Sequence, residues 1–108
     1  MDSTAINSIN FYNNLDTSTI LHFEDMKEGS RFEIVFCENR ETKYGDKEIL
    51  YIRELNDEEG ILYRIYLKAY YIPLFRGIPE ALEKGDRYEF RFKKMVSKRA
   101  AFTLHKFK

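Results

Sequence analysis

Cysteine, tryptophan and long apolar runs are scarce or absent in this sequence of 108 residues. The single cysteine, Cys37, excludes an internal disulfide and a zinc site built from several cysteines, and it favours a reducing compartment. No stretch approaches the ~20 consecutive apolar residues of a membrane span, and the N-terminus has neither the basic start nor the apolar run of a secretory signal peptide. We therefore expect a soluble intracellular protein of the cytoplasm or nucleus, with no membrane partner.

Sequence motifs for catalysis are also missing. The five glycines, at positions 29, 45, 60, 77 and 85, fit neither a phosphate-binding loop nor a dinucleotide fingerprint. His22 and His105 lie far apart in the sequence, and no local signature marks Cys37 as a nucleophile. The acidic residues 57–59 are typical of a solvated hairpin tip. We therefore predict that the protein is not an enzyme and that it uses no metal or cofactor.

The charged residues that are present are unevenly distributed. Residues 87–108 contain eight Lys or Arg and one acid, Glu89, so this segment carries a formal charge of +7. The remainder carries −7, and the whole chain is neutral. Lys and Arg gain affinity for nucleic acids by releasing the counterions condensed on the phosphates, whatever the base sequence. The C-terminal segment therefore favours a phosphate-rich partner, and a solvated strand face is the alternative interpretation.

Alternation of apolar and polar residues predicts an all-β domain. In residues 87–93 aromatic rings alternate with charged side chains, which puts the rings on one face of a strand and the charges on the other. The predicted strands cover residues 31–36, 47–55, 61–67, 87–96 and 100–106. In the first of them we expect Phe32, Ile34 and Phe36 to face inward.

Turn residues and prolines define the connections between these strands. The polar residues 38–47 form the expected connection between the first and second strands, with Gly45 at or near its tip. Two prolines and a glycine exclude a strand from residues 68–85. Within that connection, Pro79 at the start and Gly85 at the end predict a short helix.

The first 19 residues differ in composition from the rest of the chain. Asn, Ser, Thr and Asp dominate residues 1–19, which predicts a flexible arm ahead of a domain at residues 20–108. The apolar residues Ile6, Ile9 and Tyr12 have a spacing that also fits a short helix. Such a segment could dock on the domain or mediate a contact with another molecule.

The order of these elements resembles the oligonucleotide/oligosaccharide-binding (OB) fold, a five-stranded Greek-key barrel with a helix between strands three and four. The resemblance covers residues 20–108. Residues 23–29 lead into the first strand, and the Thr42-Lys43-Tyr44-Gly45 turn is similar to the turn between strands one and two in several single-stranded-DNA-binding proteins of viruses and mobile elements. An SH3-like barrel is the structural alternative. The resemblance implies non-catalytic binding of single-stranded DNA, or of RNA, as in replication.

In proteins of the resembling fold the ligand lies across strands two and three, between the loop joining strands one and two and the loop joining strands four and five. The matching positions of this chain hold tyrosines, lysines and arginines. They are Lys43, Tyr44, Lys47, Tyr51, Arg53, Arg64, Tyr66, Lys93, Lys94, Lys98 and Arg99. Bases stack on rings while cations follow the phosphates, so the resemblance implies a sequence-tolerant groove for a single strand.

Some of the aromatic residues have a structural alternative. Tyr51 shares its predicted face with Ile49 and Leu55, so it is either a stacking ring or a core ring. Tyr70 and Tyr71 either plug the end of the barrel or hold a base.

A different function also fits the sequence. The barrel and the N-terminal arm could form a protein-interaction module that assembles into a homo-oligomer. If the protein binds nucleic acid, the acidic remainder of the chain could dock on basic replication proteins such as a polymerase or helicase.

Overall fold

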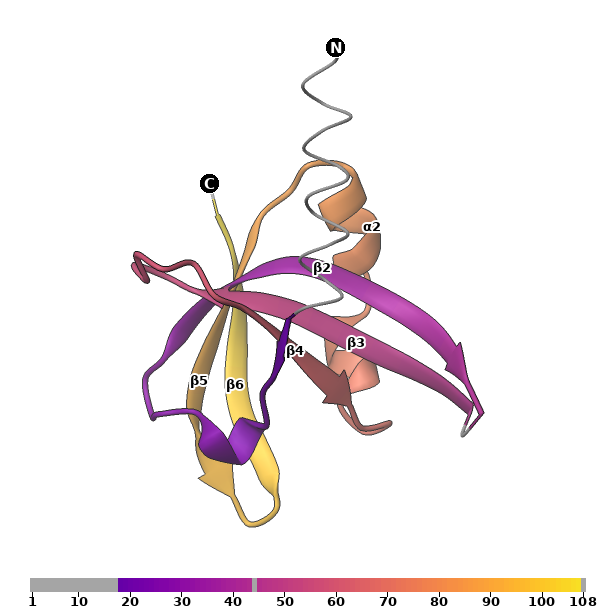
Figure 1. The fold of residues 1–108 in the computed structure, drawn as a ribbon, viewed down its shortest axis with the longest axis horizontal. Coiled ribbons are helices and arrows are strands. Elements are labelled where there is room, and N and C mark those ends of the chain that lie inside the picture. The colour runs from indigo at the N-terminus through magenta and orange to yellow at the C-terminus, as the bar shows by residue number, and fades with distance from the viewer. Residues whose placement is uncertain (1–17, 44, 108) are drawn as a thin grey trace.

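The 12-residue strand β2 (Arg31–Thr42) lies inside the sheet and pairs with two different neighbours along its length. The computed structural model describes residues 18–43 and 45–107 (Figure 1). Their strands form one sheet in the order β1-β4-β3-β2-β5-β6. The other strands are β1 (Thr19–Ile20), β3 (Gly45–Glu54), β4 (Leu62–Leu67), β5 (Tyr88–Val96) and β6 (Arg99–Lys106). The expectation of a mainly β domain is confirmed, with the two-residue strand β1 as an unpredicted addition.

A β-bulge bends β2 so that it can serve both neighbours. Arg31–Ile34 pairs with β5, whereas β3 pairs along nearly the whole of β2, with a register shift between Ile34 and Phe36. In Figure 1, β5 and β6 accordingly run across the direction of β3. A bulge inserts an extra residue and turns the following side chains to the other face. Phe36 therefore does not face inward with Phe32 and Ile34 as predicted, and it packs on the opposite side of the sheet.

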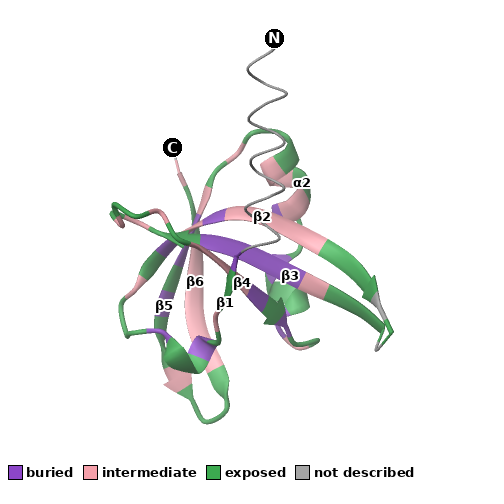
Figure 2. Cartoon of the chain, in the orientation of Figure 1, coloured by how far each residue is buried: buried purple, intermediate pink, exposed green. Residues whose placement is uncertain are grey.

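The predicted polar connection at residues 38–47 is largely strand. β2 continues to Thr42 and β3 begins at Gly45, so these polar residues pair with one another in a two-stranded ribbon. Figure 2 shows the ribbon exposed toward its tip, while the middle of β3 is buried. Polar side chains are compatible with strand pairing there because neither face of the ribbon tip is covered. The sequence prediction was wrong in treating low hydrophobicity as absence of a strand.

The connection between β4 and β5 contains the predicted helix. It follows the 3-10 turn η2 (Ile72–Phe75) and covers Ile78–Glu83 as α2. Gly77 precedes α2 with a φ of 84°, and Gly85 follows it with a φ of 94°, a conformation that favours glycine. The helix packs against β2. A second 3-10 turn, η1 (Phe23–Asp25), connects β1 to β2.

The apolar side chains form two clusters on opposite faces of the sheet. The main cluster lies beneath η1, η2 and α2. Its buried residues are Phe23, Met26, Phe32, Ile34, Leu50, Ile52, Ile65, Leu67, Tyr71, Phe75, Ile78, Phe90 and Phe92. The smaller cluster on the outer face is centred on Ile49 and Tyr51. Strand β3 contributes to both clusters, so its middle residues are fully buried.

The sheet has two open edges within the described residues, because β1 pairs only with β4 and β6 pairs only with β5. Ser18 is buried, and Thr19 and Ile20 pair with β4, so the end of the predicted arm lies against the sheet. The rest of the arm, residues 1–17, lies outside the described residues, as do Tyr44 and Lys108. Among the described helices, none is long and apolar enough to cross a membrane.

Candidate nucleic-acid interface

The predicted patch on the second and third long strands, β3 and β4, requires a cross-strand register that puts its four residues on one face, and the structure has this register. Tyr51 on β3 lies opposite Arg64 on β4, and the neighbouring pairs are Ile49 with Tyr66 and Arg53 with Leu62. Residues that face each other in an antiparallel pair project to the same side. Tyr51, Arg53, Arg64 and Tyr66 therefore share the outer face of the sheet.

Tyr51 is nevertheless a core ring, the alternative that its sequence left open. It is 0% exposed and packs with Ile49, Val35 and Phe36. Its hydroxyl donates a hydrogen bond of 2.8 Å to Glu38. Burial, followed by this carboxylate, raises the pKa of Tyr51 to about 12. A ring without exposed area offers no stacking surface, so Tyr51 is not part of the candidate interface.

Arg53 is engaged in an ion pair on the outer face. Its guanidinium lies 3.6 Å from the carboxylate of Glu33, which also accepts a hydrogen bond of 2.8 Å from Arg87. The Arg87 hydrogen bond is the main cause that lowers the pKa of Glu33. Arg53 is thus half exposed but already paired with an acid.

Arg64 and Tyr66 form the accessible part of the patch. The Arg64 guanidinium lies 6.0 Å from the centre of the Tyr66 ring, and Tyr66 is 41% exposed. Arg64 also donates a long hydrogen bond of 3.5 Å to Ser18. Its Nε is buried and has no hydrogen-bond partner among the residues that the structure describes. Among the described residues, no acid pairs with the side chain of Arg64.

The turn between β5 and β6 carries a second guanidinium on a tyrosine ring. Arg99 lies 4.3 Å from the centre of the Tyr70 ring, and Tyr70 packs against Tyr71 at 4.5 Å. The hydroxyl of Tyr71 accepts a 2.7 Å hydrogen bond from the backbone N–H of Ala100 on β6. Tyr71 is a buried core ring. It therefore anchors a stack whose outer members are Tyr70 and Arg99.

A small cleft lies between these two groups, at the edge of β4 beyond Arg64. We call it the β4-edge cleft. It is lined by His22, Phe23, Glu24, Ile65, Tyr66, Lys68, Tyr70, Tyr71 and Lys98. Its volume of about 60 Å³ corresponds to roughly two water molecules at ~30 Å³ each, which is too small to enclose a nucleobase. The cleft brings the predicted residues Tyr66 and Lys98 together.

Lys93 and Lys94 are exposed because of a second bulge. The register of β5 against β6 shifts between Phe92 and Lys94. Phe92 and Met95 pack toward the main core on either side of the shift, and both lysines between them are exposed. Neither lysine forms an ion pair within the described part of the chain. They extend the basic surface along β5.

The predicted residues of the first loop lie elsewhere. Lys43 and Lys47 are exposed near the tip of the β2–β3 ribbon, and Tyr44 lies outside the described residues. Figure 1 shows this tip and the β5–β6 turn pointing to separate places. The structure therefore divides the predicted site into two groups, and among the described residues only the group around the β4-edge cleft combines rings with cations.

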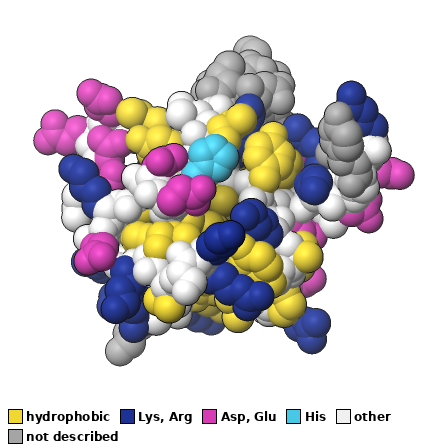
Figure 3. All heavy atoms as spheres, turned by 90° about the horizontal axis from the view of Figure 1, so that it is seen from below, with side chains coloured by type: hydrophobic (Ala, Val, Ile, Leu, Met, Phe, Trp, Pro, Cys, Tyr) yellow, Lys and Arg dark blue, Asp and Glu magenta, His cyan; other side chains and the backbone are white. Residues whose placement is uncertain are grey.

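Figure 3 shows the molecule from below the view of Figure 1, from the side where the β5–β6 turn lies. Lys and Arg side chains gather there around hydrophobic side chains near the middle of the face. The sequence left Tyr70 either as a plug at the end of the barrel or as a ring that holds a base, and Lys68 was not among the predicted site residues. Both line the β4-edge cleft. The available signal was the position of Tyr70 shortly after β4 and close in sequence to Lys68, but only the structure reveals its contact with Arg99.

Within the described residues, no cluster of His, Cys, Asp or Glu is arranged to hold a metal ion. Comparison with protein-family models, with curated proteins and with solved structures found no match. A functional assignment therefore rests on the geometry of the chain itself.

Proposed function

We propose that this protein binds single-stranded nucleic acid, DNA in the first place, without catalysis. One observation carries the proposal: two tyrosines that each contact a guanidinium, Tyr66 and Tyr70, line the same cleft. Two lysines of that cleft, Lys68 and Lys98, have no acidic partner among the described residues. Bases stack on tyrosine rings and on guanidinium planes, while the lysines attract the phosphates.

The geometry favours a single strand over a duplex. Stacking on a side chain requires a base whose flat face is uncovered, and a duplex hides these faces inside its own stack. Because the cleft is too small to enclose a base, recognition takes place on its rim and depends little on base identity. We therefore propose sequence-tolerant binding.

We further propose that the five long strands are an open form of the OB fold. The helix α2 lies between β4 and β5, and β2 pairs with both β3 and β5, as the proposed topology requires. In the OB fold, ligand binds across strands two and three beside the loop joining strands four and five. Tyr66 on β4 and Lys98 in the β5–β6 turn occupy matching elements, whereas Lys68 and Tyr70 lie in the connection that follows β4.

A protein-assembly function is the second candidate. β6 is paired on one side only within the described residues, so its other edge offers backbone groups to another chain. Together with the arm at residues 1–19, this edge could join copies of the protein into a homo-oligomer. The mass in solution of the full chain and of a chain lacking residues 1–19 tests this candidate. If both chains have the mass of a monomer, assembly through the arm is excluded.

Fluorescence anisotropy of a labelled oligothymidylate tests the proposed function. A ~20-nucleotide strand exceeds the site size of one OB-type domain. Four phosphate contacts, from Arg64, Lys68, Lys98 and Arg99, predict a binding constant about 50-fold lower at ~200 mM than at ~50 mM salt.

Duplex DNA of the same length serves as the competitor in this experiment. The proposal requires that an excess of duplex displaces little of the labelled strand. Absence of binding at low salt, or equal competition by duplex and single strand, contradicts it.

A further inference from the structure

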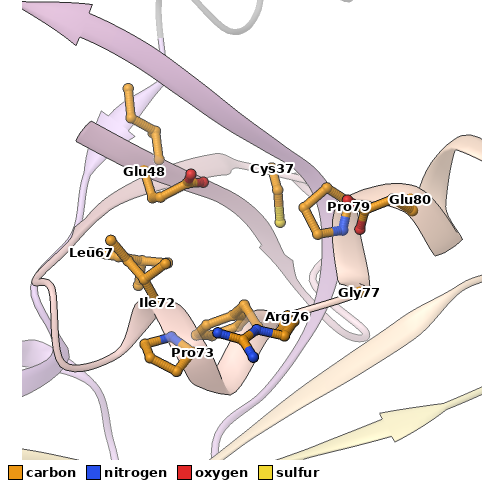
Figure 4. A pocket seen from close by; sticks show the side chains of 11 residues that line it. Cys37, Glu48, Leu67, Ile72, Pro73, Arg76, Gly77, Pro79 and Glu80 are labelled. Atoms are coloured by element: carbon orange, nitrogen blue, oxygen red, sulfur yellow. The ribbon is translucent and has the colours of Figure 1, made fainter. Parts of the chain in front are cut away.

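A pocket separate from the β4-edge cleft opens where the inner face of the sheet meets the η2–α2 segment. We call it the Cys37 pocket (Figure 4). Its volume is about 210 Å³, and Cys37, Glu48, Leu67, Ile72, Phe75 and Glu80 are among its lining residues. The residues labelled in Figure 4 come from strands β2, β3 and β4 and from the η2–α2 segment. The pocket is therefore built by elements far apart in the sequence.

The size and surroundings of the Cys37 pocket fit one side chain of a polypeptide. Pockets for drug-sized ligands usually measure ~300 to 1,000 Å³, so 210 Å³ is small for such a molecule. Beside the pocket, η2 exposes two apolar residues, Ile72 at 37% and Leu74 at 56%. An anchor side chain in a pocket, surrounded by further apolar contacts, is a common arrangement at protein interfaces.

Two carboxylates give the Cys37 pocket a negative character. Burial raises the pKa of the Cys37 thiol to about 12, and the charges of Glu48 and Glu80 add to this effect. The thiol is therefore neutral and part of the apolar lining. Glu48 accepts a hydrogen bond of 2.8 Å from Asn39, whereas the carboxylate of Glu80 has no hydrogen-bond or ion-pair partner within the described residues. Arg76 is the one base in the lining.

We propose that the Cys37 pocket binds an apolar side chain of a partner polypeptide in which Lys or Arg residues flank that side chain. The pocket holds the anchor, Ile72 and Leu74 cover the adjacent backbone, and Glu48 and Glu80 attract the flanking cations. The same carboxylates repel phosphates, so this site is chemically opposite to the β4-edge cleft. It goes beyond nucleic-acid binding and does not depend on it.

Three tripeptides test this proposal by NMR titration of the full-length, ¹⁵N-labelled chain. They are Ac-Lys-Phe-Lys-NH2, Ac-Lys-Ala-Lys-NH2, which lacks the anchor, and Ac-Glu-Phe-Glu-NH2, which has the opposite charges. The first should cause saturable shifts of the backbone amides of Ile72, Phe75 and Gly77. We expect about tenfold weaker binding of each of the other two, because each lacks one half of the recognition.

The Glu80→Gln variant tests the charge requirement. It should weaken binding of Ac-Lys-Phe-Lys-NH2 and leave the affinity for Ac-Glu-Phe-Glu-NH2 unchanged or higher. Glu83→Gln on the same helix is the matched control, since Glu83 is exposed and does not line the Cys37 pocket. Absence of shifts with the wild-type chain, equal binding of all three peptides, or equal effects of the two variants would each overturn the proposal.

Discussion

Arginine side chains differ in their partners between two regions of the described structure, since they meet carboxylates on the outer face of β2 and β5 and tyrosine rings near the edge of β4. On the outer face, Glu89 accepts two hydrogen bonds of 2.7 Å from Arg31 and a further one from Arg91. Its side chain is only 3% exposed. At the edge of β4, by contrast, Arg64 and Arg99 lie against Tyr66 and Tyr70.

The difference shows that the basic C-terminal segment is not one surface. Three of its eight bases, Arg87, Arg91 and Lys106, form ion pairs with Glu33, Glu89 and Asp86. A guanidinium that is already held by a carboxylate gains little from a phosphate, because it must exchange one anion for another. Within the part of the chain that the structure describes, Lys93, Lys94, Lys98 and Arg99 form no such ion pair. The two regions should therefore respond differently to mutation.

Reversal of the two charges on the β5–β6 turn should have the largest effect. In Lys98→Glu/Arg99→Glu, we expect about 100-fold weaker binding of single-stranded DNA, at ~1.4 kcal/mol for each reversed charge. Anisotropy measures this loss. The matched control is Lys27→Glu/Lys84→Glu, which changes the net charge equally at two exposed positions away from the β4-edge cleft. Equal losses in the two double variants would mean that only net charge matters.

Removal of the charge of Glu89 should affect stability and not DNA binding. We expect Glu89→Gln to lower the free energy of unfolding by about 2 kcal/mol. This value lies between those for exposed and for buried pairs, because the carboxylate is buried while its arginines are partly exposed. Urea unfolding measures it, with the exposed Glu28→Gln as the control. A large loss of DNA affinity in Glu89→Gln would erase the distinction between the two regions.

Acid should weaken the outer face through the same carboxylate. The hydrogen bond from Arg31 is the main cause that lowers the pKa of Glu89 from 4.5 to about 2. A group whose folded pKa is depressed contributes its full stability above the unfolded pKa and loses it as the pH falls through the folded pKa. Wild-type stability should therefore decline between pH 4.5 and about 2. Urea unfolding at several pH values should show a smaller decline in Glu89→Gln.

Removal of an exposed ring should reduce binding without reducing charge. We expect Tyr66→Leu to bind single-stranded DNA about tenfold more weakly, because a stacked base contributes ~1 to 3 kcal/mol. Tyr66→Phe keeps the ring and should bind within twofold of wild type, roughly 0.4 kcal/mol. The buried Tyr51→Phe should also leave the affinity unchanged. If Tyr66→Leu bound like wild type, cations alone would explain the interaction.

Relief of strain in the β5–β6 turn should have the smallest effect. Ser97 has a φ of 58°, in the left-handed region that glycine adopts more readily. Ser97→Gly should therefore raise the free energy of unfolding, by up to about 1 kcal/mol. Thermal unfolding measures this change. The DNA affinity should stay within twofold, roughly 0.4 kcal/mol, if the turn keeps Lys98 and Arg99 in place.

The sequence predicted those parts of the fold that depend on local patterns. Period-two alternation identified the five long strands, and the Pro79 and Gly85 signals identified α2. Alternation does not reveal a bulge, since one inserted residue looks like an ordinary interruption of the pattern. The bulge beyond Ile34 turned Phe36 to the outer face, where it packs with Tyr51. Tyr51, which the sequence left as either a stacking ring or a core ring, is buried as a result.

The partners of the charged residues could not be predicted because they come from distant parts of the chain. Glu89 is 58 residues from Arg31, and Tyr70 is in another connection from Arg99. Both contacts depend on how β2 meets β5 and on where the β4–β5 connection passes β6. Composition thus indicated a basic segment, but only the three-dimensional pairing separates Arg87 and Arg91, which are paired with carboxylates, from Arg99, which lies on Tyr70.

The most direct test of this difference compares the salt dependence of single-stranded DNA binding in Arg99→Gln and in Arg87→Gln. Each lost phosphate contact should reduce the slope of log K against log salt by ~0.7. The account predicts this reduction for Arg99→Gln, whose guanidinium lies on Tyr70, and an unchanged slope for Arg87→Gln, whose guanidinium is held by Glu33. Equal slopes in the two variants would contradict it.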